Sequence, residues 1–183
     1  MGKDTEHTIL KKCRDGDKAS FRWVVQTYQR MVFSLALKML ADEEEAKDVV
    51  QDTFIRAWQN LEGYDFQRPF ATWLYTIATR LCLDRLRRMH IKPMPQDETV
   101  LRRFADDADT ERTLENSEWT SIVRLLAAEL SEKQRLVFTL CQLEGLSMAE
   151  VERISGIDVG KVKSNLHAAR QKIRKRLTEL GYE

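Results

Sequence analysis

Apolar side chains recur three and four positions apart along most of the chain, the spacing that puts them on one face of an α-helix. One stripe runs from Phe21 to Met39 and another from Ala46 to Leu61. The remaining helices predicted from this spacing cover residues 5–14, 70–88, 114–130, 132–143, 147–156 and 159–177. No segment alternates apolar and polar residues as a strand would, so we predict an all-α fold.

Residues that favour helix starts stand directly before these segments. Asp42 precedes three glutamates, which the positive end of the helix dipole favours. Ser131 and Asp158 occupy equivalent positions before two later helices. Ser147 is followed three residues later by Glu150, the spacing of a capping box. The predicted boundaries therefore have local polar partners.

The helical pattern stops in residues 93–113, which contain Pro93, Pro95 and a run of acidic side chains. This composition predicts a flexible acidic linker between two small helical domains, residues 1–92 and 114–183. The charge supports the division, because residues 1–92 carry a net +3, residues 93–130 a net −5 and residues 131–183 a net +3. Two basic ends around an acidic middle suggest two nucleic-acid modules.

Composition excludes several other classes of protein. The 183 residues contain no apolar run long enough to cross a bilayer, and the N-terminus lacks the apolar core of a secretory signal. The three cysteines are far apart and odd in number, which argues against disulfides or a zinc site and favours the cytoplasm. There is no glycine-rich phosphate loop, catalytic triad or metal-ligand spacing, so we expect neither enzymatic activity nor a cofactor.

The C-terminal pair of helices has the layout of a helix-turn-helix, whose second helix enters the DNA major groove. That second helix contains no acidic residue between Val159 and Thr178. At 100° per residue, one face is apolar and is predicted to join the core: Val159, Val162, Leu166, Ala169, Ile173 and Leu177. Arg170 lies near its edge, where an internal salt bridge and DNA contact are equally reasonable.

The opposite face is predicted to bind DNA. The N-terminal part of such a helix reaches base edges, so we expect the base contacts to come from Lys161, Ser164, Asn165, His167 and Ala168. Gln171 lies on the same face. Phosphate contacts are expected from the basic side chains that flank or follow these residues: Lys163, Lys172, Arg174 and Lys175.

Several long motifs resemble one family over nearly the whole chain. DVVQDTFIRAW (residues 48–58), FATWLYTIATRLCLDRLRR (70–88) and LSEKQRLVFTL (130–140) occur in order before the helix-turn-helix. Together they resemble bacterial sigma factors of the extracytoplasmic-function group. The resemblance implies a sigma-2 and a sigma-4 domain that bind core RNA polymerase, through its β′ clamp helices and β flap, and direct it to promoters. Such factors often have an anti-sigma protein as a further partner and respond to stress or envelope signals.

The outward face of residues 42–61 is the candidate polymerase-binding surface. Ile55 is apolar on an otherwise polar strip, and the resemblance implies docking on the β′ clamp helices. The candidate contacts on this face are Asp48, Gln51, Asp52, Ile55 and Gln59. The alternative is a face that meets only solvent.

The loop at residues 63–69 and the helix after it are the candidate site for the −10 element. The resemblance implies that the loop captures a base flipped out of the DNA, and aromatic rings can stack on such a base. The candidate residues are Tyr64, Phe66, Gln67 and Arg68 in the loop, Thr72, Tyr75, Thr76 and Thr79 along the helix, and Arg87 and Arg88 as phosphate contacts.

Structural roles compete with DNA binding in this region. Tyr64 and Phe66 are the residues that would anchor the loop to the core. The helix is apolar almost all round, which predicts that part of its DNA-facing side is buried. Arg80 or Arg85 is expected to pair with Asp84.

The whole pattern predicts a non-enzymatic promoter-specificity subunit. The main alternative is an autonomous helix-turn-helix regulator that binds duplex DNA alone, and a weaker one is a protein that binds only protein partners. The motifs at 48–58 and 70–88 are not needed by a simple regulator and favour the first reading. Asn165 and Ala168 replace arginines found in many relatives, which changes the promoter sequence expected rather than the binding mode.

Overall fold

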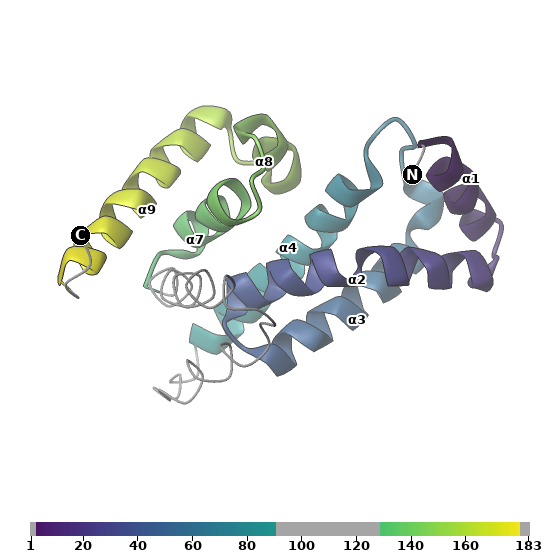
Figure 1. The fold of residues 1–183 in the computed structure, drawn as a ribbon, viewed down its shortest axis with the longest axis horizontal. Helices are drawn as coiled ribbons and strands as arrows, with labels where there is room; N and C mark the ends of the chain where they lie inside the picture. Colours follow the sequence, from purple (N-terminus) through teal and green to yellow (C-terminus); the bar gives the residue numbers. More distant parts are fainter. Residues whose placement is uncertain (1–2, 91–128, 180–183) are drawn as a thin grey trace, which may run out of the picture.

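The computed structural model describes residues 3–90 and 129–179, and within these ranges all regular structure is helical. The predicted linker at 93–113 and nearly all of the predicted helix at 114–130 lie outside the described residues. The other predicted helices are confirmed, and the all-α prediction holds for the part of the chain that is described (Figure 1).

The N-terminal domain is built around three long helices that pack against one another. Its elements are α1 (Lys3–Arg14), α2 (Lys18–Leu40), α3 (Glu43–Gln59), the 3-10 turn η1 (Leu61–Gly63) and α4 (Phe70–His90). The predicted apolar stripes form the core, where Leu35 of α2, Val49 of α3 and Leu74 of α4 have no exposed surface. The helix α1 lies across one end and contacts α2 and η1.

The C-terminal domain has the predicted helix-turn-helix. Its elements are α7 (Glu132–Phe138), a π-helical turn η2 (Thr139–Leu143), α8 (Met148–Ser155) and α9 (Val159–Glu179). The buried face of α9 packs on α7 and α8 through Val162, Leu166 and Ile173. Its opposite face is left to solvent, as the sequence pattern predicts.

The predicted caps form the expected hydrogen bonds. The Asp42 carboxylate accepts from the Glu45 N–H at 3.0 Å, and Ser147 forms both bonds of a capping box with Glu150. Gly156 ends α8 with φ 70°, a left-handed conformation that glycine adopts without steric cost. Asp158 then accepts from the Gly160 N–H at 2.9 Å and starts α9. These local signals fix the turn of the helix-turn-helix.

The two domains pack against each other in this structure. The elements α7, α8 and η2 lie beside α2 and α4 (Figure 1). The buried guanidinium of Arg135 donates to the Met39 carbonyl at 3.1 Å, and Lys38 forms an ion pair with Glu144. Burial lowers the pKa of Arg135. The sequence pattern carries no signal for this arrangement, because each contact joins residues about 100 positions apart.

Among the described residues, no helix is long and apolar enough to span a membrane. Within the same ranges, no cluster of three or more His, Cys, Asp or Glu is placed to hold a metal ion. The cysteines Cys13, Cys82 and Cys141 are free thiols.

Candidate polymerase and nucleic-acid interfaces

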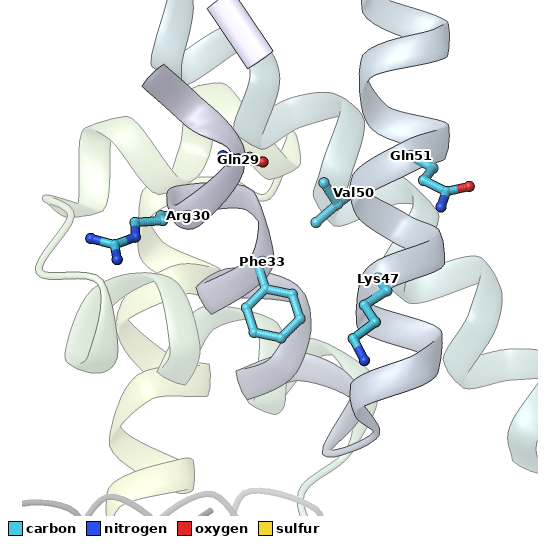
Figure 2. Close-up of a pocket in the computed structure, with 6 residues that line it drawn as sticks. All are labelled: Gln29, Arg30, Phe33, Lys47, Val50 and Gln51. Atoms are coloured by element: carbon cyan, nitrogen blue, oxygen red, sulfur yellow. The ribbon is translucent and has the colours of Figure 1, made fainter. Parts of the chain in front are cut away.

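The outward face of α3 has the exposed apolar residue that the sequence indicated. Ile55 is 54% exposed, and Asp48, Gln51 and Gln59 are also on the surface. Beside them, α2 and α3 form a groove of about 400 Å³ (Figure 2). It is lined by Gln29, Arg30, Phe33, Lys47, Val50 and Gln51.

The sequence pattern did not indicate the part of this groove that α2 contributes. Phe33 and Val50 are only half-buried and supply apolar surface between the two helices. Phe33 directly follows the buried Val32 and therefore falls outside the core stripe of α2, which is the one sequence signal for its position. The groove shares Gln51 with the outward face of α3 and therefore extends the candidate interface from one helix to two.

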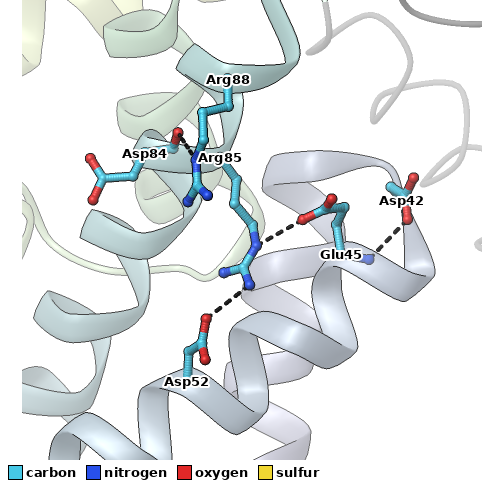
Figure 3. A network of polar contacts seen from close by, with 6 residues as sticks. All are labelled: Asp42, Glu45, Asp52, Asp84, Arg85 and Arg88. Carbon is cyan, nitrogen blue, oxygen red and sulfur yellow. Dashed lines mark hydrogen bonds and ion pairs between the residues drawn. The ribbon is translucent and has the colours of Figure 1, made fainter. Parts of the chain in front are cut away.

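Asp52, a candidate polymerase contact, also forms an ion pair within the protein that the sequence did not indicate. Its carboxylate pairs with the Arg85 guanidinium at 2.9 Å, and the same guanidinium pairs with Glu45 at 2.8 Å (Figure 3). Arg85 is only 9% exposed. Asp52 thus ties α3 to α4, although its carboxylate remains 47% exposed at the edge of the candidate interface.

Asp84 does not pair with Arg80 or Arg85, and that expectation was wrong. It lies 3.6 Å from Arg87, while the Arg88 Nε donates to its backbone carbonyl at 3.2 Å. Arg85 is drawn instead into the space between α3 and α4, where two carboxylates compensate its buried charge. Arg87 and Arg88 keep exposed side chains, as a phosphate-contacting role requires.

Tyr64 is a core residue, which corrects its expected role as a base-stacking side chain. It is 6% exposed, and its ring packs on Phe70 and Trp73 at centroid distances of 5.2 Å and 5.1 Å. The hydroxyl donates to the Arg68 carbonyl, which closes the loop. Burial raises the pKa of Tyr64 to about 12. No face of the ring is free to stack on a base.

Phe66 is also anchored by contacts inside the protein, in this case with α1. Its ring lies 4.7 Å from the His7 ring, and the Arg14 guanidinium sits 4.9 Å from its centroid. Contacts between α1 and the Phe66 ring thus hold the loop in place. Gln67 and Arg68 remain exposed, with Arg68 3.4 Å from the Asp65 carboxylate. The polar half of the loop is accessible, and its aromatic half is the anchor.

The candidate −10 face of α4 is divided between exposed and covered positions. Thr72 and Thr76 are half-buried. Tyr75 is 7% exposed and Thr79 is 2% exposed, so both are covered in this arrangement. Tyr75 donates to the Glu144 carboxylate of the C-terminal domain at 2.7 Å. The burial anticipated from the apolar pattern of this helix therefore falls on two of the predicted contact residues.

The recognition helix α9 presents its predicted DNA face to solvent. The side chains that are exposed include Lys161, Lys163, Ser164, His167, Gln171, Lys172, Arg174 and Lys175. Asn165 and Ala168 are half-buried, and the Asn165 amide donates to the Lys161 carbonyl at 2.7 Å. These residues form one largely exposed basic surface, on which the Lys172 ammonium donates to the Gln134 side chain of α7 at 3.0 Å.

Two residues at the boundary of this face differ from the simple helical projection. Val159 is 37% exposed rather than buried, because it opens the helix and its N–H is held by the Glu152 carboxylate at 3.2 Å. Arg170 donates to Gln142 at 2.7 Å. Among the described residues Arg170 is therefore exposed and forms an internal hydrogen bond to a neutral side chain rather than a salt bridge.

The described residues thus present two candidate nucleic-acid surfaces and one candidate interface for a protein partner. Family comparison makes the class specific. Residues 24–90 match the model of sigma-70 region 2, and residues 121–173 match that of sigma-70 region 4. The chain is 32% identical to the ECF RNA polymerase sigma factor SigW of Bacillus subtilis, covering 93% of this chain and 96% of that protein. It is 30% identical to the ECF RNA polymerase sigma-E factor of Haemophilus influenzae, covering 96% and 97%.

The chain belongs to the extracytoplasmic-function group of sigma-70 factors. Solved structures share its fold: CnrH, in complex with the cytosolic domain of CnrY, has a TM-score of 0.67 at 23% identity and covers 94% of this chain and 97% of its own. RpoE of Bartonella quintana, in complex with the anti-sigma factor NepR, has a TM-score of 0.65 at 18% identity, covering 86% and 96%. The function is that of a promoter-specificity subunit, and the reading as an autonomous regulator is not favoured.

Proposed function

We propose that this chain binds core RNA polymerase through α3 and the adjoining groove, the −10 element through its first domain and the −35 element through α9. The domains are residues 1–92 and 114–183, joined by a linker at 93–113. The subunit is not an enzyme, since the polymerase carries out the chemistry while this chain positions the DNA. Its place is with the polymerase in the cytoplasm.

Exposed apolar surface on α3 is the observation that supports the polymerase site best. Ile55 and Val159 are the large hydrophobic side chains left exposed in the described residues. Ile55 lies one helical turn after Gln51, which lines a groove together with the apolar Phe33 and Val50 and the charged Arg30 and Lys47. An apolar centre with a polar rim is the composition of a protein–protein interface. The β′ clamp helices are the proposed occupant.

The −10 and −35 assignments rest on what the two domains expose. In the loop, Gln67 and Arg68 can hydrogen-bond an unpaired base or its phosphate. In α9, Lys161 and Ser164 lie at the helix start where base edges are within reach, while Lys172 and the basic residues beyond it lie where phosphates run.

An anti-sigma protein is proposed as a further partner. Of two solved structures that share the fold of this chain, RpoE of Bartonella quintana is in complex with the anti-sigma factor NepR, and CnrH is in complex with the cytosolic domain of CnrY. Affinity purification of the chain from its own cells, followed by mass spectrometry of proteins present in stoichiometric amounts, tests this.

The experiment for the polymerase site compares two like substitutions. Ile55→Glu introduces a charge into the proposed apolar centre and should weaken binding to core polymerase at least about 30-fold, as loss of an interface hot spot does. Val159→Glu makes the same change at the other exposed apolar residue and should leave binding intact. Equal affinities of the two variants for core polymerase, measured by fluorescence anisotropy, would overturn the assignment.

A further inference from the structure

A buried ion pair joins the two domains at the end of η2. The Glu144 carboxylate accepts from the Lys38 ammonium at 2.5 Å and from the Tyr75 hydroxyl at 2.7 Å. The Lys38 and Glu144 side chains are only 13% and 9% exposed. Lys38 also donates to the Leu143 carbonyl at 3.3 Å. The π-helical turn Thr139–Leu143 presents both acceptors to one lysine.

This contact covers only one of the three proposed functional surfaces. Tyr75 lies on the face of α4 proposed to line the single strand, is 7% exposed and donates to Glu144 of the C-terminal domain. Thr79, one turn further, is also buried, and its hydroxyl donates to the Tyr75 carbonyl of its own helix at 2.7 Å. By contrast, the recognition face of α9 and Ile55 of α3 are exposed in the same structure. The packing of the domains is therefore compatible with polymerase docking and duplex contact, but it blocks access of a strand to this part of α4.

Lys38 and Tyr75 have the chemistry of an anion site. An ammonium and a hydroxyl from two different helices converge on two oxygens of one carboxylate. A backbone phosphate of a nucleic acid, like the Glu144 carboxylate, is negatively charged and has two oxygens that accept hydrogen bonds. Lysine and tyrosine are among the side chains that commonly contact such a phosphate.

We propose that Lys38 and Tyr75 form a binding site for a backbone phosphate of single-stranded promoter DNA, and that Glu144 occupies this site while the two domains are packed together. The inference rests on the proposed role of α4 in the −10 interaction. Opening of the domains exchanges an internal carboxylate for a DNA phosphate. In the free chain, a single strand must therefore displace Glu144 before its phosphate can bind at this site.

The energetics of a buried pair suit such an exchange. Desolvation of a lysine and a glutamate nearly cancels their attraction, so a pair of this kind adds little net stability. Removing the glutamate alone leaves the lysine charge uncompensated in the closed arrangement, which favours opening. The pair can therefore hold a specific arrangement and still yield when the strand supplies another anion.

The test measures the full-length chain binding to a fluorescein-labelled pool of single-stranded 20-mers randomised at every position. A phosphate contact carries no sequence information, so a random pool reports it. Glu144→Gln should bind at least about tenfold more tightly than the unaltered chain, the factor of one charge-assisted hydrogen bond. Its radius of gyration by small-angle X-ray scattering should increase, with unchanged helix content by circular dichroism.

Glu129→Gln is the matched control in the C-terminal domain. Its carboxylate pairs with Arg176 at 3.3 Å, the Glu129 and Arg176 side chains are 58% and 46% exposed, and Arg176 is not among the proposed DNA contacts. The same change of charge should therefore raise binding to the pool by less than about threefold. An equal gain for both variants would mean that loss of any negative charge from this domain improves binding, and would overturn the role of Glu144.

Glu144→Gln combined with Lys38→Gln separates a phosphate site from a simple steric block. Both this double variant and Glu144→Gln lack the ion pair, but only the single variant retains the cation. The double variant should lose most of the gain in affinity, and its salt dependence should fall by about 0.7 in log–log slope, as expected for one phosphate contact on a single strand. Equal affinity and equal slope for the two variants would refute the phosphate site.

The results that would overturn the phosphate site differ from those that would overturn the proposed function. Normal association of Glu144→Gln with core polymerase and normal promoter transcription, together with unchanged affinity for the random pool and unchanged radius of gyration, would overturn the exchange at Lys38 alone. Failure of the unaltered chain to bind core polymerase would overturn the proposed function instead.

Discussion

The buried guanidinium of Arg85 allows a stability effect to be worked out from its contacts. It forms charge-assisted hydrogen bonds with Glu45 at 2.8 Å and with Asp52 at 2.9 Å. Each such bond contributes about 1.5 kcal/mol, the lower end of the usual range, because the carboxylates are 41% and 47% exposed. Against this, the Arg85 Nη1 is buried with no hydrogen-bond partner among the described residues, a cost of about 1 kcal/mol.

Arg85→Met keeps the apolar stem and removes the charge, so the expected net loss is about 2 kcal/mol. For a chain of this length that corresponds to a fall in melting temperature of about 4–8 °C. Arg88→Met is the control, because Arg88 is exposed and makes one hydrogen bond to a backbone carbonyl, so its loss should cost less than about 0.5 kcal/mol. Thermal unfolding followed by circular dichroism measures both, and equal melting temperatures would refute the reasoning.

Three further predictions concern the DNA surfaces and a buried thiol. Alanine at both Gln67 and Arg68 should spare polymerase binding but reduce permanganate reactivity of promoter thymines, and normal reactivity would make the loop purely structural. Lys161→Ala should relax preference at one base at a cost of about 1–3 kcal/mol, whereas Lys172→Ala should weaken transcription evenly across a promoter library and lower the salt slope by about one. Burial raises the pKa of Cys82 to about 12, so below that pH its thiol stays protonated and should react with Ellman's reagent only after unfolding.

Local chemistry explains why so much of the fold was predictable from the sequence. Helix stripes, caps and the left-handed glycine at the end of α8 depend on residues a few positions apart, and these appear in the structure as expected. The exposed Ile55 and the basic face of α9 followed from the same periodicity. Each of these features is set by residues that lie close together in the chain.

The misassigned residues are those whose environment depends on how the elements pack in space rather than on helical periodicity. Tyr64 is an aromatic side chain in an exposed-looking loop, but Phe70 and Trp73, a few positions further along the chain, enclose it once the loop folds onto α4. Arg85 is drawn to carboxylates on α3 rather than to its neighbour Asp84, because burial between helices selects partners by position in space. The half-exposed Phe33 was missed for the same reason, since its groove exists only once α2 and α3 are packed together.

A promoter-specificity subunit should open promoter DNA only together with core polymerase. A promoter selected from a library by the reconstituted holoenzyme is probed with permanganate in the presence of the chain alone, of core polymerase alone and of both. We expect reactive thymines at the −10 element only with both components, and their loss when Ile55→Glu replaces the unaltered chain. Sequence-specific binding of the duplex by the chain alone, with affinity unchanged by core polymerase and no strand opening, would contradict it.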